Sequence, residues 1–265
     1  MAEGPSRWHG WHNAEIYAGY VRDFPLYRQL NARLARLADL ATARRVLDLA
    51  CGTGATAQAC LRHLPWNGEV VGVDVSEEMV GVARTEVDDP RASFRVARAS
   101  RIEEVVRGPF DRAVCNTAFW QFPDPGLVLG VLGRLLSPGA LLVWNVPVER
   151  MVGEPARAHP FQVALARAIE ARAGSFTSSP PVLTGATLEA WIEGAGFDLV
   201  DTERYVYSAR QEELVELMRI PAMIGSVALD LSPEERQGVI DLAAEWIDGD
   251  ERVEVPWLYY VARRR

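Results

Sequence analysis

Short apolar runs and amphipathic stretches alternate along the first 147 residues of the chain. The apolar runs are rich in Val, Leu and Ala, which is typical of strands covered on both faces of a sheet. They predict five buried strands, at residues 45–50, 69–74, 93–97, 110–116 and 140–146. The stretches between them predict helices at residues 55–63, 77–87, 101–107 and 124–136. This alternation favours βαβ units, and therefore a doubly wound α/β fold with a mostly parallel sheet and helices on both faces.

Two segments lie outside this alternation. Leucines recur at helical spacing ahead of the first strand, which predicts a helical cap over residues 1–40. Residues 148–182 contain a helical stretch near Phe161–Ala173 and then GSFTSSPP, whose composition is typical of a loop. We interpret this segment as a lid-like insert after the fifth strand.

The C-terminal part, residues 183–265, again mixes both periodicities. It predicts helices at residues 188–193, 212–219 and 233–248 and strands at residues 197–207 and 253–261. Ser232, followed by Pro233 and Glu235, is typical of a helix start. Because neither an internal repeat nor a linker is visible, we predict one domain, 1–265.

A glycine turn follows the first predicted strand, in the sequence VLDLACGTGATA at residues 46–57. Gly52 and Gly54 let a ligand approach bare backbone where a helix opens. Asp74 lies 20 positions beyond Gly54, at the end of the second strand. Since parallel strands end at the same edge of a sheet, Asp74 is placed to bind the two hydroxyls of a ribose. The pattern predicts a nucleoside site, with residues 44–147 as the cofactor-binding core.

Two ligand classes fit this loop. The sequence GTGATA also matches the dinucleotide fingerprint G-x-G-x-x-G/A, so an NAD-dependent dehydrogenase is an alternative. Asp48, four residues before Gly52, disfavours a pyrophosphate and favours a ligand that carries an ammonium and a sulfonium. All 28 basic residues are Arg and none is Lys, which excludes a lysine Schiff base, a phosphate loop with lysine and the kinase ATP pair.

Charge and cysteine content narrow the partners and the compartment. The chain has 36 acidic and 28 basic residues and a net charge of −8, so it offers no basic surface for a nucleic acid. Cys51, Cys60 and Cys115 lack C-x-x-C spacing, which favours free thiols and predicts neither a disulfide nor a metal site. No signal-peptide core and no run of 18 apolar residues is present. We therefore expect a cytoplasmic protein with a small-molecule substrate, bound to neither nucleic acid nor membrane.

Four segments together carry a resemblance to a known family. They are VLDLACGTG (46–54), VVGVDVSEEMV (70–80), FDRAVCNTAFWQFPDP (110–125) and LGRLLSPGALLVW (132–144). In these segments the chain resembles the class I S-adenosylmethionine-dependent methyltransferases of the small-molecule type. The resemblance runs from Tyr17 to Val146 and continues more loosely to the C-terminus.

The resemblance implies a Rossmann-like sheet of seven strands in the order 3-2-1-4-5-7-6, with the last strand antiparallel. It implies S-adenosylmethionine as cofactor, S-adenosylhomocysteine as product, and methyl transfer to an O, N or C nucleophile of a small-molecule acceptor. A protein that binds the cofactor without transferring its methyl group, as a binding module or in a sulfonium-assisted rearrangement, is a second alternative.

The resemblance also implies a set of cofactor-binding residues. Asp48, Ala50, Gly52 and Gly54 fall at the amino-acid end of the cofactor, Asp74 and Val75 at the ribose, Met79, Ala99 and Ser100 near the adenine, and Asn116 in the pocket wall. Ala50 replaces the first glycine of the family loop, a small change. Arg98 stands where many members carry an acidic residue that reads the adenine amino group, so backbone groups of Ala99 and Ser100 are expected to take that role.

Candidates for the acceptor side are fewer. Methyl transfer to a hydroxyl needs a base, and histidine titrates in the right range. His12 and His159 are the candidate catalytic bases, because the resemblance places their segments over the substrate pocket, although a surface or capping role fits each of them too. Trp120 and Gln121 follow the fourth strand and are candidate substrate-binding residues, since an aromatic face stabilises a nearby cation. Among three tyrosines of the cap, Tyr20 is the first choice for covering the cofactor.

Overall fold

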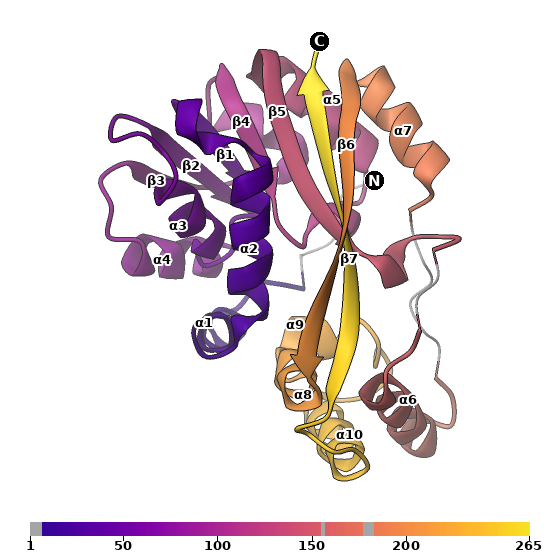
Figure 1. The fold of residues 1–265 in the computed structure, drawn as a ribbon. Helices are drawn as coiled ribbons and strands as arrows, with labels where there is room; N and C mark the ends of the chain where they lie inside the picture. The colour runs from indigo at the N-terminus through magenta and orange to yellow at the C-terminus, as the bar shows by residue number, and fades with distance from the viewer. Residues whose placement is uncertain (1–6, 155–156, 177–182) are drawn as a thin grey trace.

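One seven-stranded sheet organises the chain (Figure 1). The computed structural model describes residues 7–154, 157–176 and 183–265. The strands are β1 (Arg45–Leu49), β2 (Glu69–Asp74), β3 (Ala92–Val96), β4 (Phe110–Cys115), β5 (Leu136–Pro147), β6 (Phe197–Arg210) and β7 (Arg252–Arg264). Their order is β3-β2-β1-β4-β5-β7-β6, and only β7 runs antiparallel to its neighbours. Both the predicted fold class and the predicted strand order are confirmed.

Helices cover both faces of this sheet. They are α1 (Trp11–Asp23), α2 (Pro25–Leu37), α3 (Ala55–Leu61), α4 (Glu77–Glu86), α5 (Pro125–Leu135), α6 (Pro160–Ala173), α7 (Gly185–Gly194), α8 (Gln211–Met218), α9 (Pro221–Ile224) and α10 (Pro233–Glu245). Buried side chains of α5 and α7 pack on one face, and those of the other eight helices belong to the core of the opposite face. Side chains of β5 alternate between the two faces of the sheet, so Val143 belongs to one core and Trp144 to the other.

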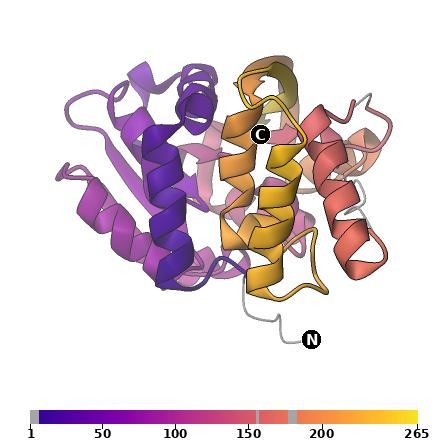
Figure 2. The same cartoon turned by 90° about the horizontal axis from the view of Figure 1, so that it is seen from below.

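The antiparallel pair β6 and β7, joined through α8, α9 and α10, extends beyond the carboxyl edge of the parallel strands. Pairing of β5 with β7 ends at Pro147 and Trp257, whereas β6 stays paired with β7 as far as Arg210 and Arg252. Figures 1 and 2 show α6, α8, α9 and α10 grouped around this projecting end, on the same side of the molecule as α1. The carboxyl ends of β1, β2, β4 and β5 therefore face a helical layer instead of open solvent.

Two local predictions are wrong for identifiable reasons. Residues 93–97 were expected to form a buried strand, but β3 is the edge strand of the sheet and Phe94 is its one buried residue. Residues 101–107 were expected to form a helix, and the chain instead forms a short 3-10 helix at Ala99–Glu104. Ile102 is the one buried side chain of this turn, too little apolar surface to hold a longer helix.

The element boundaries elsewhere follow local chemistry. Ser232 caps α10 in a capping box with Glu235, and Pro233 is the first residue of the helix, as predicted. Residues 1–40 were predicted to be a helical cap, and α1 and α2 account for most of their described part. The short helix α9 had no prediction. Among the described helices, not one combines the length and the apolar character needed to cross a bilayer.

Close packing at Gly72 gives a test of the core. A Cβ atom on Gly72 would lie 2.5 Å from Cδ1 of Phe94 and 3.0 Å from Sγ of Cys51. We expect Gly72→Ala to lower the free energy of unfolding by about 1–3 kcal/mol through overpacking. Gly130→Ala is the control, because a Cβ there meets nothing within 4 Å in the middle of α5. It should raise the same quantity by about 0.5–1 kcal/mol. Urea denaturation measures both, and equal effects would contradict the packing assignment.

Candidate functional site

The loop between β1 and α3 has an unusual backbone. Ala50, Gly52 and Gly54 have φ values of 56°, 52° and 87°, in the left-handed region that glycine adopts readily. A Cβ on Gly54 would lie 2.6 Å from Cγ2 of Val87, so this position needs glycine for space as well as for conformation. Ala50 adopts a conformation that costs free energy for a residue with a side chain. The loop is thus held in its shape by the surrounding structure.

Asp74, at the end of β2, stabilises this loop through hydrogen bonds to its backbone. Its Oδ2 accepts a hydrogen bond of 2.9 Å from the backbone N–H of Gly52, and its Oδ1 accepts one of 2.9 Å from the N–H of Ser76. Burial raises the pKa of Asp74, while hydrogen bonds from Ser76, Gly52 and Val75 oppose the rise. One carboxylate therefore ties the turn after β1 to the turn after β2.

Asp48 is a buried carboxylate without a partner. It is fully inaccessible to solvent, and neither oxygen accepts a hydrogen bond of normal geometry from any residue in the described part of the chain. Burial raises its pKa well above the usual value, and the nearby Asp74 adds to the rise. The backbone N–H of Ala57 opposes this rise without meeting the geometry of a hydrogen bond. An unpaired buried charge is costly, and a cationic group bound beside it would remove that cost.

Helix α1 and the residues just before it lie over the glycine loop. A Cβ on Gly52 would lie 3.5 Å from Cε1 of Tyr17, so the Tyr17 ring rests against the loop. Trp8 packs edge-on against Tyr17, with ring centroids 5.7 Å apart. His9 Nδ1 lies 3.5 Å from Glu78 Oε2 on α4. These contacts extend the cap from the loop across to α4.

Three tyrosines form a buried cluster behind this segment. The ring centroids of Tyr17 and Tyr27 are 5.3 Å apart, and those of Tyr20 and Tyr27 are 5.9 Å apart. Burial raises the pKa of Tyr27 to about 12 and that of Tyr20 further, so both phenols stay neutral at physiological pH. The hydroxyl of Tyr20 is buried without a partner in the described structure. Tyr17, not Tyr20, is the tyrosine that touches the glycine loop.

Asn116, at the end of β4, belongs to a chain of buried amides. Its Nδ2 donates to Oδ1 of Asn31 at 2.7 Å, and its Oδ1 accepts from Nδ2 of Asn145 at 2.7 Å. Asn145 Oδ1 accepts from the backbone N–H of Thr117 at 2.7 Å, where φ is 54°. Both polar ends of Asn116 are therefore used inside the protein. Asn31 was missed from the sequence, although a lone Asn on the apolar face of α2 was the available signal.

Gln121 connects the cap to the carboxyl end of β4. Its Oε1 accepts hydrogen bonds from Nε1 of Trp8 at 2.8 Å and from Nη2 of Arg7 at 2.9 Å, and its Nε2 donates to the carbonyl of Thr117 at 3.1 Å. The adjacent Trp120 lies with its ring centroid 6.2 Å from that of Trp257 on β7. Both predicted acceptor-side residues thus follow β4 and contact the cap or β7, and their role toward an acceptor stays a prediction.

The residues predicted near the adenine follow β2 and β3. Met79 is buried in α4, and its backbone N–H donates to Oγ of Ser76. The backbone N–H of Ala97 donates to the Asp74 carbonyl at 2.9 Å, which brings the end of β3 beside Asp74. Ala99 and Ser100, in the turn that follows, and Val75 are half-buried. The structure therefore brings these residues to one edge of the sheet.

The two candidate histidines lie apart from this edge and in different surroundings. His12 is exposed in the first turn of α1. His159 is the N-cap residue of α6, where its Nδ1 accepts from the backbone N–H of Gln162 at 3.2 Å. Burial lowers the pKa of His159 to about 4, so its imidazole is neutral at physiological pH. A catalytic role for either residue stays a prediction.

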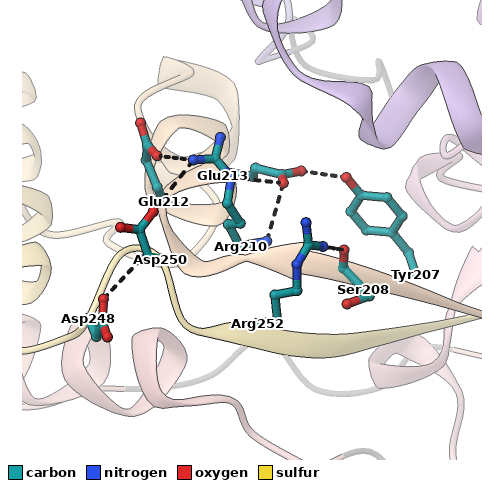
Figure 3. Close-up of polar contacts among 8 residues, drawn as sticks. All are labelled: Tyr207, Ser208, Arg210, Glu212, Glu213, Asp248, Asp250 and Arg252. Atoms are coloured by element: carbon teal, nitrogen blue, oxygen red, sulfur yellow. Dashed lines mark hydrogen bonds and ion pairs between the residues drawn. The ribbon is translucent and has the colours of Figure 1, made fainter.

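A polar network joins the far ends of β6 and β7 to α8, with Tyr207 and Glu213 buried at its centre (Figure 3). The hydroxyl of Tyr207 donates to Oε2 of Glu213, and the backbone N–H of Arg210 donates to Oε1 at 3.2 Å. Arg210 also pairs with Glu212 at 2.9 Å and lies 3.7 Å from Asp250. This network had no prediction, although Tyr207, Arg210 and Glu213 lie close in sequence; Asp250 joins it only because β6 and β7 pair. It fixes the helical layer that faces the carboxyl edge.

Comparisons with known proteins agree with this geometry. The methyltransferase domain family matches residues 46–139. The chain is 29% identical over 175 residues to ubiquinone biosynthesis O-methyltransferase of Xanthomonas oryzae pv. oryzae (strain PXO99A), covering 65% of this chain and 70% of the relative. It is 29% identical over 231 residues to trans-aconitate 2-methyltransferase of Methylobacterium radiotolerans, covering 82% and 83%.

A solved structure extends the likeness to almost the whole fold. A putative methyltransferase from Bacillus halodurans C-125 superposes with a TM-score of 0.59 at 19% identity, covering 88% of this chain and 98% of that one. The sheet order and the glycine loop define a Rossmann-like methyltransferase fold. The comparisons identify residues 46–139 as similar to a methyltransferase domain and the whole chain as similar to S-adenosylmethionine-dependent methyltransferases, which supports S-adenosylmethionine as the cofactor. The dehydrogenase interpretation of the same glycines is not supported.

The unpaired charge of Asp48 gives a test on the ligand-free protein. The raised pKa in the folded state means that stability is full below the unfolded value, about 3.9, and is lost as pH rises through the folded value. Asp48→Asn should remove this loss and raise the free energy of unfolding at pH 8 by about 1–3 kcal/mol. It should also weaken binding of S-adenosylhomocysteine, measured by calorimetry.

Asp89→Asn is the matched control. Hydrogen bonds from Arg91 lower the pKa of Asp89, so its substitution should change stability in the opposite direction and leave cofactor affinity unchanged. If unfolding of Asp48→Asn and of the unsubstituted protein depended on pH in the same way, the charge of Asp48 would not destabilise the folded state.

Proposed function

We propose that this enzyme transfers a methyl group from S-adenosylmethionine to an O, N or C nucleophile of a small-molecule acceptor, with Asp48 and Asp74 holding the cofactor. The unpartnered carboxylate of Asp48 carries the proposal. The methionine ammonium of the cofactor is the positive charge that this buried acid lacks. Relatives named for ubiquinone biosynthesis and for trans-aconitate support a metabolite as acceptor.

The proposed cofactor contacts use the hydrogen-bond positions that each side chain still has free within the described structure. Each oxygen of Asp74 accepts one backbone hydrogen bond and keeps a lone pair for a ribose hydroxyl. Gly52, which has no side chain, and Ala50 and Gly54 shape the loop against the amino-acid end. Around the purine we assign Val75, Met79, Ala99 and Ser100. Asn116 shapes the pocket wall through its bonds to Asn31 and Asn145.

Alignment is the main task of the protein in this reaction. The cofactor, when bound, supplies a methyl group already activated by a cationic sulfur. We assign the exclusion of water to Tyr17 and Trp8, which cover the loop. Trp120 and Gln121 orient the acceptor at the mouth, and the aromatic rings there favour a nearby positive charge. Tyr20 adds a neutral buried hydroxyl to the same cluster.

The finer assignments extend this proposal. We propose that the insert at residues 148–182 closes over the acceptor; of its GSFTSSPP stretch, residues 177–181 lie outside the described residues. Three free buried cysteines support a reducing, cytoplasmic location. The net charge of −8 supports a small acceptor and argues against nucleic acid.

Cofactor choice is tested by titration calorimetry with S-adenosylhomocysteine and with NAD. We expect binding of S-adenosylhomocysteine and none of NAD. Asp74→Ala should weaken that binding by about 1–3 kcal/mol, because charge-assisted bonds to two hydroxyls are lost. Asp124→Ala is the control, since Asp124 also accepts a backbone hydrogen bond at a helix start but lies at α5. Tight NAD binding without a response to S-adenosylhomocysteine would refute the proposal.

The histidines are tested by S-adenosylhomocysteine release over a panel of small metabolites. If His12 or His159 is the base, its loss should lower kcat by about 100-fold or more and remove one limb of the pH profile. His12→Ala and His159→Asn are the variants, because Asn keeps the helix cap at residue 159. His63→Ala is the control. Unchanged turnover in both variants would remove these bases, and cofactor binding without any release would favour the non-transferring alternative.

A further inference from the structure

Arg150 is a largely buried arginine whose Nε has no hydrogen bond in the described structure. It ends the short 3-10 helix Val148–Arg150, directly after β5. Its side chain is only 19% exposed, its Nε is buried without a hydrogen bond, and its one ion-pair contact within the described chain is Glu149 at 3.7 Å. Elsewhere, Arg134 pairs with Glu103 at 2.6 Å and Arg36 with Glu203 at 2.9 Å. Such an unsatisfied donor in a partly buried place is costly unless a ligand completes it.

A second arginine, Arg7, is held after the neighbouring strand of the sheet. Its Nη2 donates to Gln121, in the 3-10 helix that follows β4, and β4 is the neighbour of β5. Desolvation lowers the pKa of Arg7 and the positive charge of Arg150 lowers it further, so the two guanidinium groups interact unfavourably. Within the described residues, Glu149 is the acidic side chain that forms an ion pair with Arg150. An anion bound between Arg7 and Arg150 would be attracted to both guanidinium groups and would offset their mutual repulsion.

The position of the pair along the sheet edge fits an acceptor. The cofactor loop follows β1, and β4 and β5 are the next strands in the sheet order. Trp257, whose buried Nε1 has no partner in the described structure, pairs with Pro147 at the end of β5 and contacts Trp120. Hydrogen-bond donors therefore gather at the ends of these two strands, beside the residues assigned to the acceptor.

We propose that Arg150 and Arg7 form a subsite for a carboxylate group of the methyl acceptor. The inference rests on the proposed function and narrows its substrate class to carboxylic acids. A guanidinium presents paired N–H donors that match the two oxygens of a carboxylate. Gln121 holds Arg7 in place and so acts as a positioning residue. The carboxylate is a handle for binding; the methylated atom lies elsewhere on the acceptor or is one of its oxygens.

The test compares matched pairs of acceptors. S-adenosylhomocysteine release is measured over a panel of hydroxy-, amino-, phenolic and polycarboxylic acids and over the primary amides of the same compounds. We expect turnover of acids only. For the best acid, Arg150→Gln and Arg7→Gln should each raise KM by about 10- to 100-fold with a smaller change in kcat, because a charged hydrogen-bond partner of the bound acceptor is lost. Arg150→Lys should keep part of the affinity, since lysine keeps the positive charge but lacks the paired N–H donors of a guanidinium.

Controls separate the failure of this inference from that of the proposed function. Arg134→Gln, at an exposed pair with Glu103, should leave KM unchanged. S-adenosylhomocysteine affinity, measured by calorimetry, should be the same in all four variants. Turnover of amides as fast as acids, turnover restricted to phosphate esters, or an unchanged KM in Arg150→Gln and Arg7→Gln would overturn the carboxylate subsite while leaving methyl transfer in place. Absence of S-adenosylhomocysteine binding would instead refute the proposed function.

Discussion

The geometry of the site depends on one carboxylate that joins two turns. β1 and β2 pair in parallel register up to Leu49 and Val73, so their ends fall side by side. Asp74 then accepts the N–H of Gly52 from one turn and the N–H of Ser76 from the other. A left-handed backbone at three alternate loop positions, Ala50, Gly52 and Gly54, is strained, and the bonds of Asp74 help to hold it. The place of Tyr17 against Gly52 and the burial of Asp48 both follow from that loop conformation.

A second constraint acts across the sheet. Asn31, Asn116 and Asn145 link α2, β4 and β5 through bonds of 2.7 Å, and Thr56 adds a bond of 2.8 Å to Asn31. Asn116 and Asn145 each use their donor and their acceptor within the network, and Oδ1 of Asn31 accepts from both Thr56 and Asn116, a directional arrangement that apolar packing does not require. The network therefore specifies how α2 sits on the sheet, and it holds Thr117 at the start of the turn that leads to Gln121.

The sequence allowed prediction of what is local or repeated. Strand and helix periodicity predicted β1, β2, β4, β6 and β7, and the spacing from the glycines marked Asp48 and Asp74. The surroundings of Arg150 and Arg7 were not predictable, because they are built by segments far apart in the chain. For His159 the capping role was among the interpretations of the sequence, since a polar residue before Pro160 is typical of a helix cap, and the structure shows that cap.

The N-terminal segment has a kinetic consequence. It is bonded at one side to Gln121 after β4 and at the other to Glu78 on α4, and between them Tyr17 rests on the glycine loop. If the cofactor binds at the glycine loop as proposed, this segment lies across it, and exchange of the cofactor and its product requires these contacts to open.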